Sequence, residues 1–143
     1  MNATSAVRYE QEIPEVIKAL VGVHQTMVGE GFDRTVTHLV HLRASQINGC
    51  AHCLKMHLKE ARHDGETDER LDRLVVWRHV NDFTEREKAA LAWTEALTSL
   101  EKPSDLGALR AELRQHFSEK EIGLLTAEVA QINLWNRLQV SNH

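Results

Sequence analysis

Two cysteines and a histidine stand close together in the middle of this sequence. Cys50 and Cys53 are spaced C-x-x-C and are the only cysteines among the 143 residues, and His57 follows the second of them by four positions. Residues 39–62, which contain all three, read L-V-H-L-R-A-S-Q-I-N-G-C-A-H-C-L-K-M-H-L-K-E-A-R. A pair of thiols beside an imidazole can carry out redox chemistry or bind a metal ion.

Helical geometry places these three side chains on one face. If residues 53–63 are helical, at about 100° of rotation per residue, then Cys50, Cys53 and His57 fall within an arc of about 60°. The same geometry turns His52 away from that face. The spacing therefore predicts a common site for the two thiols and one imidazole.

The two kinds of chemistry make different demands. A redox pair needs a thiolate at neutral pH, which a helix N-terminus and a nearby imidazolium favour, and a second thiol that resolves the oxidised product as a disulfide. A zinc site would use both thiolates and His57 as three of its four tetrahedral ligands. A structural alternative is that both cysteines are simply small buried hydrophobes. Gly49, directly before the pair, and His57 at helical spacing make that alternative less favoured.

Composition narrows the class of protein. A chain of 143 residues with a formal net charge of -4 fits a single domain, 1–143, large enough to bury a core without disulfide staples. The mixed charges form no basic stripe and aromatic residues are few, so nucleic acid is not an expected partner. No signal peptide pattern and no apolar run of membrane-spanning length is present, so we expect a soluble, cytoplasmic protein without membrane contact. A reducing compartment favours a catalytic or metal-binding cysteine pair over a structural bridge.

The hydrophobic pattern has the period of helices throughout. No segment alternates with the period of a strand, and only 7 glycines and 2 prolines interrupt the chain. We expect an irregular lead-in over 1–12, from which Val7 and Tyr9 can dock on the body, followed by an all-α, single-domain bundle of about six to seven helices. The expected helices cover 14–29, 34–47, 50–63, 67–77, 84–99, 106–117 and 118–132, with Trp135 and Leu138 in an extension or a short final helix.

Several helix starts and further candidate residues can be named. Asp33, Thr67, Thr84 and Ser118 are expected N-caps, the last two opening capping boxes.

His38, His41 and Ser45 recur at helical spacing and share a face. His24 lies in an apolar stripe and is interpreted as a hydrogen-bonded core histidine. The tryptophans are interpreted as core or subunit-contact residues rather than parts of a substrate pocket: Trp77, Trp93 and Trp135.

Residues 42–57, L-R-A-S-Q-I-N-G-C-A-H-C-x-x-x-H, resemble the core signature of the AhpD-like alkylhydroperoxidase family, part of the carboxymuconolactone decarboxylase superfamily. Residues 90–98, A-L-A-W-T-E-A-L-T, resemble a second segment common in its members. The likeness extends over roughly residues 14–138. It implies an AhpD-like all-α fold, assembly as a homo-oligomer (trimer, hexamer or dimer), and thiol-dependent reduction of peroxides or disulfides. It implies no cofactor, and an external thiol or dithiol as the reductant.

The resemblance also implies a role for each residue of the motif. Cys53 would attack the peroxide and Cys50 would close the disulfide. His57 would accept the thiol proton. His52 matches a histidine that family members often carry inside the motif.

One position departs from the family pattern. Twelve residues before the first cysteine, family members usually carry a glutamate that forms a proton relay with the histidine matching His57, and here that position is His38. We expect weaker or differently pH-dependent peroxidase activity, which His38→Glu would raise or shift. The change also adds a fourth ligand to the zinc alternative, whose set becomes Cys50, Cys53, His57 and His38, with His41 as a further candidate. A third hypothesis is a family member that keeps the fold but has lost or changed its activity.

Overall fold

The computed structural model describes residues 2–143, and throughout this range the regular structure is helical, with no strand. The predicted all-α class is confirmed. In chain order the elements are α1 (Tyr9–Glu12), α2 (Pro14–Gly29), α3 (Arg34–Asn48), α4 (Ala51–His63), α5 (Asp68–Arg73), the 3-10 helix η1 (Leu74–His79), α6 (Glu85–Thr98), α7 (Leu106–Leu113) and α8 (Glu119–Val140).

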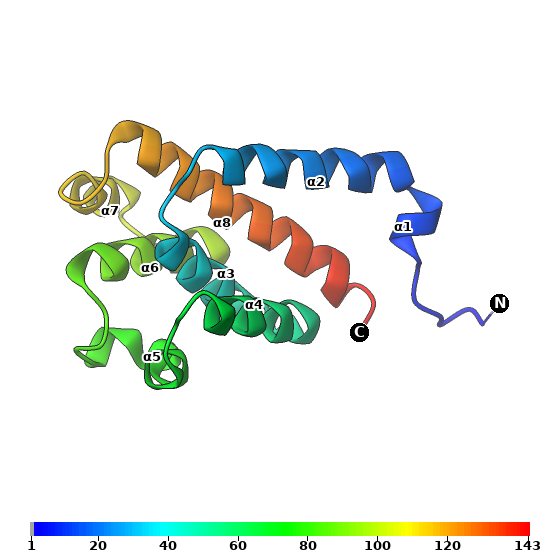
Figure 1. The fold of residues 1–143 in the computed structure, drawn as a ribbon, viewed down its shortest axis with the longest axis horizontal. Coiled ribbons are helices and arrows are strands. Elements are labelled where there is room, and N and C mark those ends of the chain that lie inside the picture. The colour runs from blue at the N-terminus through cyan, green and yellow to red at the C-terminus, as the bar shows by residue number, and fades with distance from the viewer. Residues whose placement is uncertain (1) are drawn as a thin grey trace.

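Helix α3 lies at the centre of the bundle and packs against α4, α6 and α8 (Figure 1). Its apolar side chains are almost completely buried, and they divide between two core clusters. Val36, Val40 and Ala44 face α6, α7 and α8. Leu39 and Leu42 face α4, α5, η1 and α6. Since burying one such side chain contributes roughly 1.5–3 kcal/mol, these two clusters fix the position of α3 and of the turn that follows it.

The helices begin at the residues that the sequence predicts. Each of the four expected N-cap side chains accepts a hydrogen bond from the backbone N–H three residues later: Asp33, Thr67, Thr84 and Ser118. The last two form complete capping boxes with Glu87 and Glu121. Such a cap is worth about 1 kcal/mol, which explains why these boundaries could be predicted locally.

The predicted helix 67–77 is divided, contrary to expectation. Helix α5 ends at Arg73, and η1 continues through Val76, whose φ of -117° and ψ of 26° are not helical. Leu74 and Trp77 are both buried. Their spacing of three residues places them on the same side of a 3-10 turn, so core packing favours the tighter helix here.

Helix α8 continues to Val140, so of the two predicted alternatives the extension is confirmed. It is 22 residues long. Neither α8 nor another helix of the described chain is long and apolar enough to cross a membrane.

The N-terminal segment docks on the end of α8. The Val7 backbone N–H donates to Asn142 at 3.0 Å, and the hydroxyls of Tyr9 and Ser141 are 2.7 Å apart. The single turn α1 lies within the lead-in that the sequence predicted as irregular. Helix α2 then runs along one side of α8 (Figure 1), and its buried residue is Met27. Four valines of α2 are exposed in a single chain: Val16, Val21, Val23 and Val28.

Candidate active site

The turn between α3 and α4 presents the two cysteines. Gly49 has a φ of 65°, in the left-handed region that favours glycine, and the N–H of Cys50 donates to Ser45 O at 3.0 Å. Cys50 is the N-cap of α4, and its Sγ accepts a hydrogen bond from Cys53 N at 3.3 Å. The two sulfurs are joined as a disulfide. The C-x-x-C motif thus lies at a helix N-terminus, where the helix dipole favours a thiolate after reduction.

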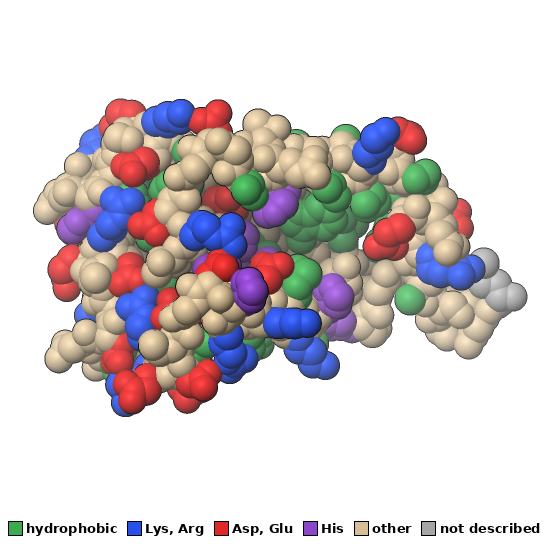
Figure 2. All heavy atoms as spheres, viewed as in Figure 1, with side chains coloured by type: hydrophobic (Ala, Val, Ile, Leu, Met, Phe, Trp, Pro, Cys, Tyr) green, Lys and Arg blue, Asp and Glu red, His purple; other side chains and the backbone are tan. Residues whose placement is uncertain are grey.

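The two sulfurs differ in their surroundings. Both cysteines are buried, but Cys53 lines a cavity of about 330 Å³ and Cys50 does not. Figure 2 shows apolar side chains in the hollow between α2 and α4, with histidines at its edges. The cavity is lined from α2, α3, α4 and α8 by Val21, His24, His41, His52, Cys53, Met56, His57, Glu60, Gln131, Ile132, Trp135 and Gln139. A small molecule that enters it can reach Cys53.

His57 is buried beside Cys53 on the same cavity wall. Its Nδ1 lies 3.2 Å from a carboxylate oxygen of Glu60, and its ring centroid lies 4.6 Å from that of His41. Burial, and next the His41 imidazole, lower the pKa of His57 to about 4, although Glu60 acts in the opposite direction. His57 is therefore neutral at pH 7 and can accept a proton.

His41 is held by a residue that the sequence analysis missed. Its Nε2 hydrogen-bonds a carboxylate oxygen of Glu128 in α8 at 2.7 Å, and both side chains are buried. The sequence does contain a signal for Glu128. It stands between Leu125, Val129 and Ile132 in the buried stripe of α8, where an unpaired charge would be costly.

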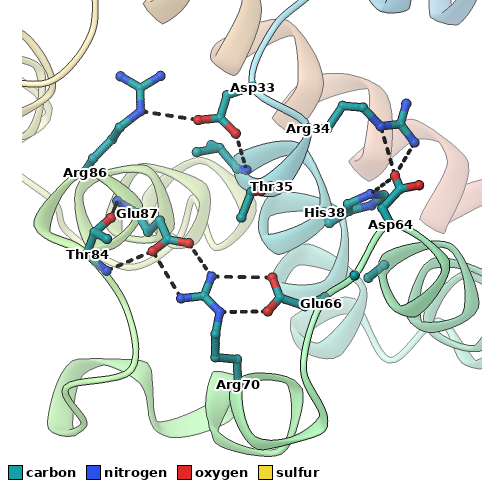
Figure 3. Close-up of a pocket in the computed structure, with 13 residues that line it drawn as sticks. Asp33, Arg34, Thr35, His38, Asp64, Glu66, Arg70, Thr84, Arg86 and Glu87 are labelled. Atoms are coloured by element: carbon teal, nitrogen blue, oxygen red, sulfur yellow. Dashed lines mark hydrogen bonds and ion pairs between the residues drawn. The ribbon is translucent and has the colours of Figure 1, made fainter.

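His38 does not line the cavity that contains Cys53. Its Nε2 lies 2.7 Å from Asp64, which also accepts hydrogen bonds from Arg34 (Figure 3). These hydrogen bonds, that of Arg34 first, lower the pKa of Asp64. His38 Nδ1 is buried without a hydrogen-bond partner. The structure therefore brings Cys50, Cys53 and His57 together but places His38 toward the start of α3, with Asp64.

A neighbouring ion cluster fixes the segment that carries Asp64. Arg70 lies between two buried carboxylates, Glu66 and Glu87, and pairs with both (Figure 3). Its Nε donates to Glu66 at 2.7 Å. The cluster joins Glu66, two residues after Asp64, to the first turn of α6.

Three residues occupy positions that differ from the predictions. His24 is exposed and lines the Cys53 cavity, so the interpretation as a core histidine is wrong. His52, predicted to point away from the thiols, lines the same cavity at its solvent side. Trp135 is also part of the cavity wall, unlike the fully packed Trp77 and Trp93. In each case the surroundings of the side chain depend on a neighbouring helix. A helical wheel describes a single helix and cannot predict them.

The zinc alternative has no support in the arrangement of its ligands. Among residues 2–143 no group of three or more histidine, cysteine, aspartate or glutamate side chains is placed to hold a metal ion. The sulfurs of Cys50 and Cys53 are bonded to each other, and His38 is engaged by Asp64. The four proposed ligands do not converge.

Comparison with known proteins is consistent with this site. The sequence profile described as the carboxymuconolactone decarboxylase family matches residues 14–96, which include the C-x-x-C turn and His57. The chain belongs to this family. A similar protein from Bacillus subtilis, the uncharacterized protein YdfG, is 33% identical over 135 residues, covering 94% of this chain and 92% of its own. The uncharacterized protein YnjA of Escherichia coli is 33% identical over 103 residues, covering 71% of this chain and 56% of its own.

A solved structure has the same fold. The crystal structure of a protein of unknown function from Agrobacterium tumefaciens, described as a candidate antioxidant defence protein AhpD, is 38% identical. It superposes with a TM-score of 0.89, covering 96% of this chain and 94% of that one. The predicted resemblance of this family member to AhpD-like proteins is confirmed.

Proposed function

We propose that this carboxymuconolactone decarboxylase family member reduces hydroperoxides with its C-x-x-C pair. The observation that supports this most is the asymmetry of the two sulfurs. Cys53 borders a cavity next to the neutral imidazole of His57, whereas Cys50 is buried behind it. The Agrobacterium structure, described as a candidate antioxidant defence protein, supports the same class of activity.

The proposed reaction has two steps and begins with the reduced pair. The Cys53 thiol gives its proton to His57, and the thiolate attacks the terminal oxygen of ROOH. The O–O bond breaks, Cys53 becomes a sulfenic acid, and His57 returns the proton to RO⁻, giving ROH. The Cys50 thiol then condenses with the sulfenic acid, forming the disulfide and releasing water.

The cavity favours small organic hydroperoxides as substrates. Its apolar wall is formed by Val21, Met56, Ile132 and Trp135, and Cys53 lies at its inner side. A volume of about 330 Å³ is at the lower end of the range for small-molecule sites. We propose an alkyl or aryl hydroperoxide with one compact apolar group.

Each cycle consumes two electrons, which an external thiol or dithiol must supply. Such a reductant attacks one sulfur of the Cys50–Cys53 disulfide and leaves as its own disulfide after exchange. A reducing compartment such as the cytoplasm would maintain that supply.

The exposed apolar side of α2 supports self-association. Val16 and Val23 are 52% and 47% exposed in the single chain. Exposed apolar stripes of this kind are typical of subunit contacts. We propose a homo-oligomer that covers α2, tested by light scattering coupled to size-exclusion chromatography. A mass equal to one chain at micromolar concentration would contradict it.

The central test is peroxide consumption by reduced protein in a stopped-flow instrument, with cumene hydroperoxide as substrate and a dithiol as reductant. Cys53→Ser removes the attacking sulfur and should reduce consumption to the background rate of the dithiol alone. If Cys53→Ser consumes peroxide at the wild-type rate, the assignment of Cys53 is wrong. Circular dichroism of the variant confirms that the helices remain.

A further inference from the structure

The Glu128–His41 pair is a costly feature that the proposed reaction leaves unused. The two side chains are 5% and 8% exposed, and their facing atoms are 2.7 Å apart. Burying a carboxylate costs several kcal/mol unless a positive partner and hydrogen bonds compensate for it. An apolar residue at position 128 would complete the buried stripe of α8 at no such cost. The pair therefore calls for a role other than stability.

Its location connects the pair to the reacting sulfur. His41 lines the cavity that contains Cys53, and its ring is the close neighbour of the His57 ring, 4.6 Å away between centroids. His41 and Glu128 also line a second cavity, of about 350 Å³, which shares His24 and Glu60 with the first. His41 thus lies between Glu128 and His57, so a charge on the His41 ring acts electrostatically on the His57 ring.

We propose that Glu128 is a positioning residue that acts through His41: the buried carboxylate holds a positive charge on His41, and this charge keeps His57 unprotonated, and so able to accept the Cys53 proton, to a lower pH. The proposal rests on the peroxidase function proposed above. A carboxylate within hydrogen-bond distance favours the imidazolium form of a histidine, and two adjacent imidazolium rings repel each other. The carboxylate that governs His57 would then come from α8 rather than from position 38 of α3.

The proposed positive charge on His41 would also stabilise the thiolate form of Cys53. A positive group near a cysteine stabilises its thiolate, as does the N-terminus of α4. His41 keeps its proton throughout the reaction, and the proton that moves goes from Cys53 to His57 and then to the leaving alkoxide. The step remains balanced, because Glu128 and His41 contribute charge and neither gives up an atom.

The groups around His57 allow the effect of Glu128 to be separated from the others. Glu60 is the other carboxylate near the ring; it contacts His57 directly, is half exposed, and raises the pKa of His57. Glu128 would act with the opposite sign, since it works through a cation. The titratable or charged groups facing the site are His24 from α2, Arg34, His38 and His41 from α3, His52, Cys53 and Glu60 from α4, and Glu128 from α8.

The test is an NMR titration of the His57 ring in the oxidised protein, from about pH 3.5 to pH 8, which needs no turnover. Glu128→Gln keeps the shape and an oxygen that accepts the His41 hydrogen bond, but it removes the charge. The midpoint of His57 should rise above about 4 but stay below about 6.5, the ordinary value for histidine, because burial, the largest cause of the low pKa, remains. Glu60→Gln should move it in the opposite direction. Glu119→Gln, on the exposed start of α8, is the matched control and should leave it unchanged.

Two further variants show whether the effect passes through His41. His41→Gln alone should also raise the His57 midpoint, and in that background Glu128→Gln should add nothing. His41→Gln provides the same test if Glu128→Gln does not fold. An unchanged His57 midpoint in folded Glu128→Gln, or in His41→Gln, would overturn the proposal.

Activity separates this proposal from the function on which it rests. If peroxide is consumed, the acid limb of the turnover profile should move to higher pH in Glu128→Gln along with the NMR midpoint. A shifted midpoint in a protein that consumes no peroxide would contradict the proposed function and support the coupling. Normal peroxide turnover with an unchanged His57 midpoint would support the proposed function and contradict the coupling through His41.

Discussion

The His57 ring lies against the His41 ring, with 4.6 Å between centroids and 48° between planes, although one residue belongs to α4 and the other to α3. Two imidazoles this close cannot both be protonated without repulsion. His57 is also buried, so its pKa falls to about 4. This contact determines how the site and its stability respond to pH.

The first prediction concerns folding stability between pH 4 and pH 7. The pKa of His57 is about 4 in the folded protein and about 6.5 in an unfolded chain. Between these values the unfolded chain binds more protons, so the free energy of unfolding rises with pH. The His57 contribution is fully present above pH 6.5 and is lost as the pH falls through 4, with an upper limit of about 3 kcal/mol.

His57→Gln should remove this part of the pH dependence. Urea unfolding of wild type and variant at pH 7, 5.5 and 4.5 would measure the two slopes, and the wild type should lose more stability on acidification. The carboxylates titrate in both proteins, so the difference between the two curves isolates His57. Parallel curves would show that His57 is not desolvated in the folded protein.

A second prediction separates the roles of the two sulfurs. Reduced Cys50→Ser should consume one equivalent of peroxide per chain and then stop, because no second thiol is present to resolve Cys53. A dimedone adduct on Cys53, identified by mass spectrometry, would record the sulfenic acid. Wild type treated in the same way should end as the disulfide without an adduct. An adduct on Cys50 in Cys53→Ser, at the wild-type rate of peroxide loss, would reverse the assignment.

A third prediction concerns position 38. From the family pattern alone, His38→Glu is expected to restore a relay carboxylate. In the structure His38 pairs with Asp64 and does not line the Cys53 cavity. The new carboxylate would face Asp64 in a buried position, so we expect no gain in turnover and a loss of stability of about 1–3 kcal/mol. His38→Gln, which can still donate to Asp64, is the matched control. Faster turnover of His38→Glu would show that position 38 takes part in the relay.

A fourth prediction tests the cavity as the peroxide site. Val21→Trp places a large side chain in the wall of the Cys53 cavity from an exposed position on α2, which the fold should tolerate. It should lower kcat/KM for cumene hydroperoxide by about tenfold, or about 1.4 kcal/mol, and affect hydrogen peroxide much less. Gln25→Trp, at an exposed position on the same helix but outside the cavity, should change neither. Equal effects of the two variants would mean that peroxide reaches Cys53 by another route.

The residues alone left open whether the C-x-x-C motif serves redox chemistry or metal binding, and the family resemblance favoured redox chemistry. The C-x-x-C spacing predicted a thiol pair at a helix start, and the structure places Cys50 as the N-cap of α4. The metal hypothesis needed His38 as a fourth ligand. Whether a residue on α3 reaches the thiols depends on the angle and register at which α3 and α4 pack. The spacing of residues in the sequence does not determine that packing. The packing instead directs His38 to Asp64.

The sequence by itself determined what depends on neighbours within a few residues. The N-caps at Asp33, Thr67, Thr84 and Ser118, and the position of His57 one turn after Cys53, follow from local hydrogen bonds and helical geometry. Only the tertiary structure decided the surroundings that come from distant segments. It placed His24, His52 and Trp135 around Cys53. It also brought Glu128 to His41 across 87 residues of chain. The Glu128 carboxylate and the His41 ring come within hydrogen-bond distance only because α8 packs against α3.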